Sequence, residues 1–131
     1  MADVFVLLNH QLSEHQRREL KEKGVGDIHL PPEPITKLWQ GIPPDGPLPV
    51  HSLKSITSWL RKTGKTGDFV LIQGEFGATY FTVDFCFQNN LIPIYATSKR
   101  EYREEPQQDG SVVRVHRFNH VQFREYKRSI P

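Results

Sequence analysis

The sequence predicts an α/β fold in which a mostly parallel sheet is flanked by helices. Apolar runs at Val4–Leu8, Phe69–Ile72 and Leu91–Tyr95 are typical of strands that are buried on both faces. Helical patterns lie between these runs, so strand and helix alternate along the chain in the order of a doubly wound sheet. The turn dipeptide Asp109-Gly110 adds a C-terminal β-hairpin extension.

The first helix is expected to begin near Ser13 and to end at Gly24. Ser13 and Gln16 have the spacing of a capping box, and a glycine after two lysines is typical of a helix end. Asp27–Leu30 follows as a short edge strand that is closed by two prolines. The N-terminal part of the chain therefore predicts one mostly polar surface helix between two strands.

Three further helices and the strands of the hairpin extension follow in the chain. The helices are expected at Ile35–Gln40, at Ser52–Lys62, where apolar residues share one face, and at Ala78–Gln88. The hairpin is expected to consist of separate strands at Tyr102–Glu105, Ser111–Phe118 and Val121–Tyr126.

Length and composition predict one domain over residues 1–131, with residues 1–100 as the core and 101–131 as the extension. A chain of 131 residues with 37% hydrophobic residues can form one ordinary core. Cys86 is the only cysteine, so no disulfide can form within the chain; a reducing cytoplasm and a buried, unreactive thiol are expected. The N-terminal run VFVLL is too short for a membrane span, which predicts a soluble protein.

Positive charge is concentrated near the C-terminus. Residues 99–131 carry eight Lys and Arg against five Asp and Glu, a net charge of +3. This excess suits a phosphate-bearing partner, although a solvated basic face is the commoner origin of such a small excess.

Polar residues follow the ends of the predicted parallel strands. Asn9-His10, Gln73 to Gly77 and Thr97 to Arg100 are expected to meet, because ligands bind at the C-terminal edge of such sheets, where the strand order reverses. The backbone from Gly74 to Ala78, with Gly77 between them, precedes a helix whose free N–H groups favour an anion. The alternative is a glycine turn that only connects a strand to a helix.

Apolar side chains lie on two sides of the predicted helix Ala78–Gln88. One side contacts the sheet, and the other needs a second cover. Either the C-terminal tail of the chain or the same helix of a second copy in a homodimer can provide it.

The sequence lacks the patterns of common cofactor sites. No glycine follows the first strand, which excludes the dinucleotide-binding G-x-G-x-x-G turn, and the histidines are too scattered for a metal site. No cofactor and no metal are therefore expected.

The segments LLNHQL, QGEFGATYFTVDF and IPIYATSKRE resemble small stand-alone CRISPR-associated proteins related to the CARF domain, the CRISPR-associated Rossmann fold. The resemblance covers nearly the whole chain. It implies a Rossmann-like, prokaryotic, cytoplasmic homodimer that acts as a ring nuclease in type III CRISPR antiviral defence. Such an enzyme binds and linearises cyclic oligoadenylate, with cyclic tetraadenylate as the expected substrate, and switches the signal off. No DNA or membrane partner is expected.

Metal-free RNA cleavage requires a base for the ribose 2′-hydroxyl and cations for the phosphoryl oxygens. Lys99 and Arg100 are the candidate cations, and Arg100 can contact two oxygens at once. His10 is the candidate base, because imidazole ordinarily titrates near neutral pH. Its alternative role is only to hydrogen-bond the ligand.

The remaining candidates would hold the ligand. Asn9, Gln73, Thr97 and Ser98 suit ribose or adenine edges. Phe76 either stacks on a base or packs in the core, and Glu75 is either a second base or a solvated carboxylate. A lid formed by the C-terminal hairpin residues His116, Arg117 and His120 is the last element of the predicted site; exposed strand residues are their alternative.

Two other functions fit the same residues. One is a protein that sequesters the cyclic messenger without cutting it. The other is an enzyme that acts on a different small phosphorylated substrate.

Overall fold

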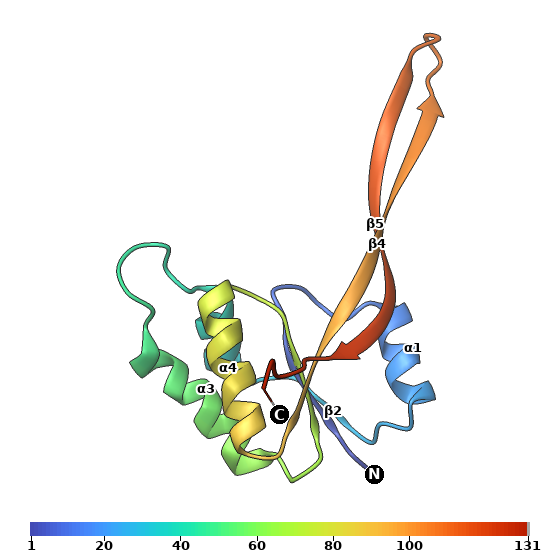
Figure 1. Ribbon diagram of the computed structural model, residues 1–131. Helices are drawn as coiled ribbons and strands as arrows, with labels where there is room; N and C mark the ends of the chain where they lie inside the picture. The colour runs from blue at the N-terminus through green and yellow to red at the C-terminus, as the bar shows by residue number, and fades with distance from the viewer. Residues whose placement is uncertain (131) are drawn as a thin grey trace.

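The computed structural model describes residues 1–130 and confirms the predicted mixed α/β fold (Figure 1). Five strands form one sheet in the order β2-β1-β3-β4-β5. The strands β1, β2, β3 and β4 pair in parallel, and β5 is antiparallel to β4. Their bounds are β1 Val4–Leu7, β2 Ile28–His29, β3 Phe69–Ile72, β4 Ile92–Pro106 and β5 Val112–Glu125.

Helices cover both faces of the sheet. Helix α1 (Glu14–Glu22) lies on one side, with α3 (Val50–Thr63) and α4 (Phe76–Gln88) on the other (Figure 1). The side chains of β1 alternate between two hydrophobic clusters: Val4 and Val6 pack with Leu20 of α1, whereas Phe5 and Leu7 pack with α2 (Glu33–Gln40), α3 and α4. Burial on both faces explains why β1 is a continuous apolar run.

The predicted helices are present, with small shifts at their ends. Ser13 caps α1 in the expected capping box with Gln16. Helix α4 begins at Phe76, two residues before the predicted start, because Glu75 rather than the Gly77 region forms its N-cap. Among residues 1–130, no helix is both long and apolar enough to cross a membrane.

The C-terminal strands differ from the prediction. The fourth strand does not end at Tyr95 but continues to Pro106, and β5 replaces the two separate strands that were expected after Asp109-Gly110. The pair runs from Ile94↔Glu125 to Pro106↔Val112 with one irregularity between Thr97 and Ser98. Beyond the domain it forms a long two-stranded arm (Figure 1). No turn residue interrupts the polar run after Tyr95, so backbone pairing with β5 extends the strand through it.

Candidate functional site

The ends of β1 and β3 lie beside Ala96, an internal residue of β4, at the point where the strand order reverses. Leu7 of β1 pairs with Ile72 of β3, and the next N–H along β3, that of Gln73, donates to the Leu7 carbonyl at 3.0 Å. The Gln73 side chain then spans to β4: its Oε1 accepts from the Ala96 N–H at 2.9 Å and its Nε2 donates to the Ala96 carbonyl at 3.3 Å. Gln73 thus continues the ladder with its side chain after the backbone pairing between β3 and β4 ends.

A hollow of about 660 Å³ opens between this edge, the loop after β1 and the base of the arm. We name it the basin. It contains His10, Gln73, Thr97, Ser98 and His120 from the predicted site. No sequence pattern predicted its other lining residues, which are Gln11, Ser13, His15, Gln16, Ala96, Phe118 and Asn119. The β1–α1 loop and the arm are remote in sequence, and only the sheet order brings them together.

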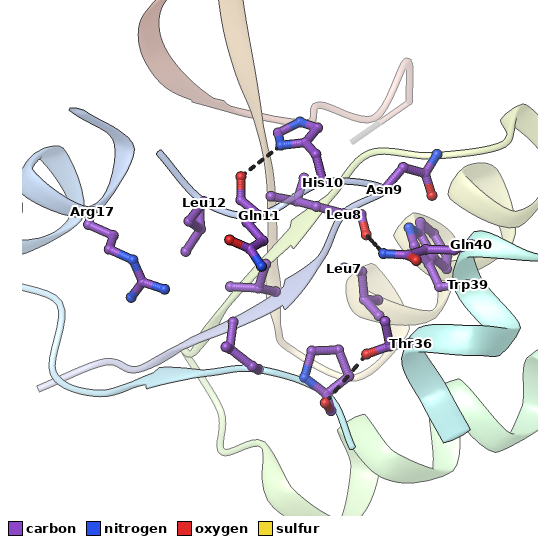
Figure 2. A pocket seen from close by; sticks show the side chains of 13 residues that line it. Leu7, Leu8, Asn9, His10, Gln11, Leu12, Arg17, Thr36, Trp39 and Gln40 are labelled. Carbon is purple, nitrogen blue, oxygen red and sulfur yellow. Dashed lines mark hydrogen bonds between the residues drawn. The ribbon is translucent and has the colours of Figure 1, made fainter. Parts of the chain in front are cut away.

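His10 is exposed and lies at the boundary of two hollows. It lines the basin and also a hollow of about 540 Å³ beside Trp39 and Gln40 (Figure 2). Its Nδ1 lies 2.9 Å from the carbonyl oxygen of Gln11. Because a carbonyl can only accept, Nδ1 carries the hydrogen in the neutral ring, and Nε2 remains free to take a proton. The geometry therefore suits a general base.

Asn9 does not reach the basin. It is exposed and lines the neighbouring hollow on the other side of the loop, near the Gln40 amide that donates to the Leu8 carbonyl at 3.3 Å (Figure 2). A ligand in the basin would contact Asn9 only if it also extended across His10.

His120 forms a fixed wall of the basin and is not a lid residue. Its side chain is only 7% exposed, and its Nε2 lies 2.5 Å from Oε1 of Glu19 in α1. Its Nδ1 is buried and has no hydrogen-bond partner within residues 1–130. Burial raises the pKa of Glu19, but hydrogen bonds from the Phe123 N–H and the His120 ring outweigh burial and lower the pKa overall. The pair joins α1 to the arm across 101 residues of sequence.

The glycine turn is not a phosphate cradle. A Cβ at Gly74 would lie 2.8 Å from Nε1 of Trp39, so the missing side chain allows the buried indole to pack on the backbone. The Trp39 Nε1–H donates to the Gln73 carbonyl at 3.1 Å. At Gly77 the nearest atom to an added Cβ belongs to Leu48. Both glycines pack against the chain itself, as the alternative of a connecting turn predicts.

The N-terminus of α4 is already capped by a carboxylate. Oε1 of Glu75 accepts from the Ala78 N–H at 2.8 Å. Glu75 is exposed and does not line the basin, so it fits the alternative of a solvated carboxylate, here used as a helix cap, better than a second base. Its negative charge disfavours a phosphate at the same N–H groups. Ala78 is fully buried in the core and is not available to a ligand.

The predicted cations lie on opposite faces of the arm. Lys99 and Arg100 are consecutive residues of β4, and successive side chains of a strand point to opposite faces. Arg100 pairs with Phe118 and places its Cζ 5.0 Å from the centre of that ring, which lines the basin. Lys99 shares the other face with Glu101 and Arg103. The two cations therefore do not form one phosphate clamp within a single chain.

The remaining residues of the predicted site lie in different parts of the molecule. Phe76 is 94% exposed and lines a hollow between α4 and the C-terminal tail, so it belongs neither to the core nor to the basin. His116 and Arg117 are consecutive in β5 and point to opposite faces of the arm. The Thr97 hydroxyl donates to the Gln122 carbonyl at 3.2 Å. The arm extends away from the domain and does not cover the basin as a lid (Figure 1).

One acidic cluster lies at the opposite edge of the sheet. Ligand atoms of Asp3, Asp27 and His29 lie within 4.8 Å of one another. The carboxylate of Asp3 is already hydrogen-bonded to the Asp27 N–H and to the His29 ring, both at 2.9 Å. Because Asp3 precedes β1, this cluster is separated from the basin by the length of the strands.

Comparison with known proteins places the chain in one family. The model of the family described as "Uncharacterized protein MJ1673 family" matches residues 2–124. The protein "Uncharacterized protein MJ1673" of Methanocaldococcus jannaschii is 41% identical over 128 residues, which cover 96% of this chain and 98% of the relative. No solved structure matches the chain. Neither description states an activity or a ligand.

Proposed function

The chain belongs to the MJ1673 family, and we propose that it is a metal-independent ring nuclease. It binds a cyclic oligoadenylate, most simply cyclic tetraadenylate, and linearises it in the cytoplasm. In this role it would end the signal of type III CRISPR defence, as the resemblance of its strand-end segments to CARF-related proteins implies.

The observation that carries the proposal is the basin itself. The segments with this resemblance are remote in sequence, and the sheet order joins their ends around one hollow of about 660 Å³. Its wall contains imidazoles, hydroxyls and amides, which are groups that bind ribose and adenine edges. The arm beside it supplies Arg100, whose Cζ lies 5.0 Å from the centre of the Phe118 ring in the basin wall.

Each role that the protein plays in the proposed reaction can be assigned to a residue in or beside the basin. His10 accepts the proton of the ribose 2′-hydroxyl at Nε2, and the 2′-oxygen attacks the adjacent phosphorus. The bond from phosphorus to the 5′-oxygen breaks, and the departing 5′-oxygen takes a proton from solvent water. The product is a linear chain with a 2′,3′-cyclic phosphate at one end and a 5′-hydroxyl at the other. Arg100, which lies over the Phe118 ring of the basin wall, neutralises the phosphoryl oxygens, and positioning of the 2′-oxygen in line supplies much of the rate.

A homodimer is part of the proposal, because the resemblance implies one and helix α4 carries apolar side chains on two sides. The C-terminal tail covers part of the outer side of α4, where Arg128 lies 5.0 Å over the Phe87 ring. Phe76 and Tyr80 of the same helix remain 94% and 76% exposed. Pairing of two α4 helices about a two-fold axis would bury these rings.

We expect the protein to have twice its chain mass of 15.2 kDa in light scattering, and Tyr80→Glu to halve that mass. A carboxylate at this position would be buried without a partner in the α4 interface. Ser55→Glu on the exposed side of α3 is the matched control and should leave the dimer intact. A monomeric parent protein, or a Tyr80→Glu variant that remains dimeric, contradicts this interface.

The proposed function is tested with labelled cyclic tetraadenylate in the presence of EDTA. We expect linear products that end in a 2′,3′-cyclic phosphate, with many turnovers per protein, because no step uses a metal ion. Binding with the ring recovered intact would identify a protein that sequesters the messenger. Absence of both binding and cleavage would contradict the proposal and favour another phosphorylated substrate.

A further inference from the structure

The arm of β4 and β5 exposes aromatic side chains to solvent. Beyond the pair Ser98↔His120 it is a two-stranded ribbon with solvent on both faces (Figure 1). Isolated ribbons of this kind are only marginally stable in water. Even so, Phe118 and Tyr102 are 64% and 59% exposed on it.

The two faces of the arm differ in chemistry. Alternation along the strands places Arg100, Tyr102, His116 and Phe118 on the same side as His120, and we name these four residues the arm face. The opposite side alternates charge along β4, with Lys99, Glu101, Arg103 and Glu105 in sequence. Aromatic rings therefore gather on the face that leads out of the basin, where Phe118 forms part of the wall.

Cross-strand contacts organise the arm face into two rows. In the row next to the basin, Arg100 lies 5.0 Å over the Phe118 ring. In the following row, Tyr102 and His116 have ring centres 4.6 Å apart at an angle of 69°. Pairing across the strands accounts for some stabilisation of the ribbon. It does not cover the outer surfaces of Phe118 and Tyr102.

We infer that the arm face is a stacking platform for the bases of a single-stranded oligonucleotide. Aromatic rings interleaved with arginine beside a polar hollow are the combination that binds single strands, in which bases stack on rings and cations contact phosphates. The placement of phosphates in the basin rests on the proposed function; the stacking of bases does not. The side of the arm that carries these rings holds Arg100 and Arg114 against a single carboxylate, Glu104, and this local positive excess favours a polyanion over a second protein chain.

The test compares two linear probes with the full-length protein. One is a tetramer of adenylate, and the other is the same ribose-phosphate tetramer without bases. Phe118→Leu removes the ring and keeps an apolar side chain, so we expect the Kd for the adenylate tetramer to rise about tenfold. The Kd for the abasic tetramer should stay unchanged. Arg100→Ala should weaken the binding of both probes, because it removes charge as well as stacking.

Matched controls lie on the opposite face of the arm. Val113→Ala and Arg103→Ala change an apolar and a cationic side chain there, and neither should alter either Kd. Circular dichroism checks that each variant keeps its strands. An unchanged Kd in Phe118→Leu, an equal loss for both probes, or no binding of the adenylate tetramer by the parent protein would overturn the inference. So would a Phe118→Leu variant that changes mass in light scattering, because the face would then be a protein interface.

These outcomes separate the inference from the proposed function. Cleavage of the cyclic ring together with an unchanged Kd in Phe118→Leu would reject the platform and keep the nuclease. Binding of linear adenylate that depends on Phe118, without cleavage of the ring, would keep the platform and reject the nuclease.

Discussion

In the Gly74→Ala variant we expect the free energy of unfolding to fall by about 3 kcal/mol, which is within the range for overpacked cores together with a broken hydrogen bond. The new Cβ would lie 2.8–2.9 Å from three atoms of the Trp39 indole, which is only 2% exposed and has little room to move. Any shift of the ring also disturbs its hydrogen bond to the Gln73 carbonyl. Denaturant unfolding measures the loss as a lower midpoint at an unchanged slope.

A double-mutant cycle identifies the cause of this loss. Trp39→Phe shortens the ring, so Gly74→Ala should cost clearly less in that background than in the parent protein. Equal costs in both backgrounds, or a Gly74→Ala protein as stable as the parent, would contradict the packing role. If Gly74 instead served a phosphate, the substitution would weaken ligand binding and leave the unfolding midpoint unchanged.

The turn around Gly74 illustrates a difference in what sequence patterns can predict. They predicted where the site lies better than they predicted the role of each side chain in it. Buried strands, capped helices and the reversal of strand order follow from local periodicity, and they predicted that the segments after Leu8 and Ile72 would meet. The role of each side chain there depends on contacts that are remote in sequence. Trp39 lies 35 positions before Gly74, and no local pattern signals that its ring would fill the space above the turn.

The same limit applies to the basic segment after Tyr95. The motif from Thr97 to Arg100 was interpreted as a loop at a strand end, and a loop would allow Lys99 and Arg100 to converge on one phosphate. Pairing with β5 turns the segment into a strand, whose pleat separates the two side chains. Glu19 and His120 were missed as a pair for a similar reason, because α1 and β5 meet only in the folded chain.

His10→Ala is expected to lower kcat for cyclic tetraadenylate about a hundredfold, at the lower end of the range for loss of a general base. Nδ1 is held by the Gln11 carbonyl, which leaves Nε2 as the proton acceptor at the edge of the basin. The ring is exposed and makes no packing contact with the hydrophobic core, so stability should change little. Single-turnover cleavage in EDTA measures the chemical step directly.

Separate measurements of kcat and KM distinguish the two roles that the sequence left open for His10, which are general base and ligand-binding residue. Loss of a base lowers kcat and leaves KM nearly unchanged, whereas loss of a ligand contact that is equal in the ground state and the transition state raises KM alone. His51→Ala, an exposed histidine on α3 remote from the basin, is the matched control and should retain full turnover. If His10→Ala changed only KM, His10 would be a binding residue. The proton of the 2′-hydroxyl would then pass to another group in the basin wall, where His15 and His120 are the remaining imidazoles.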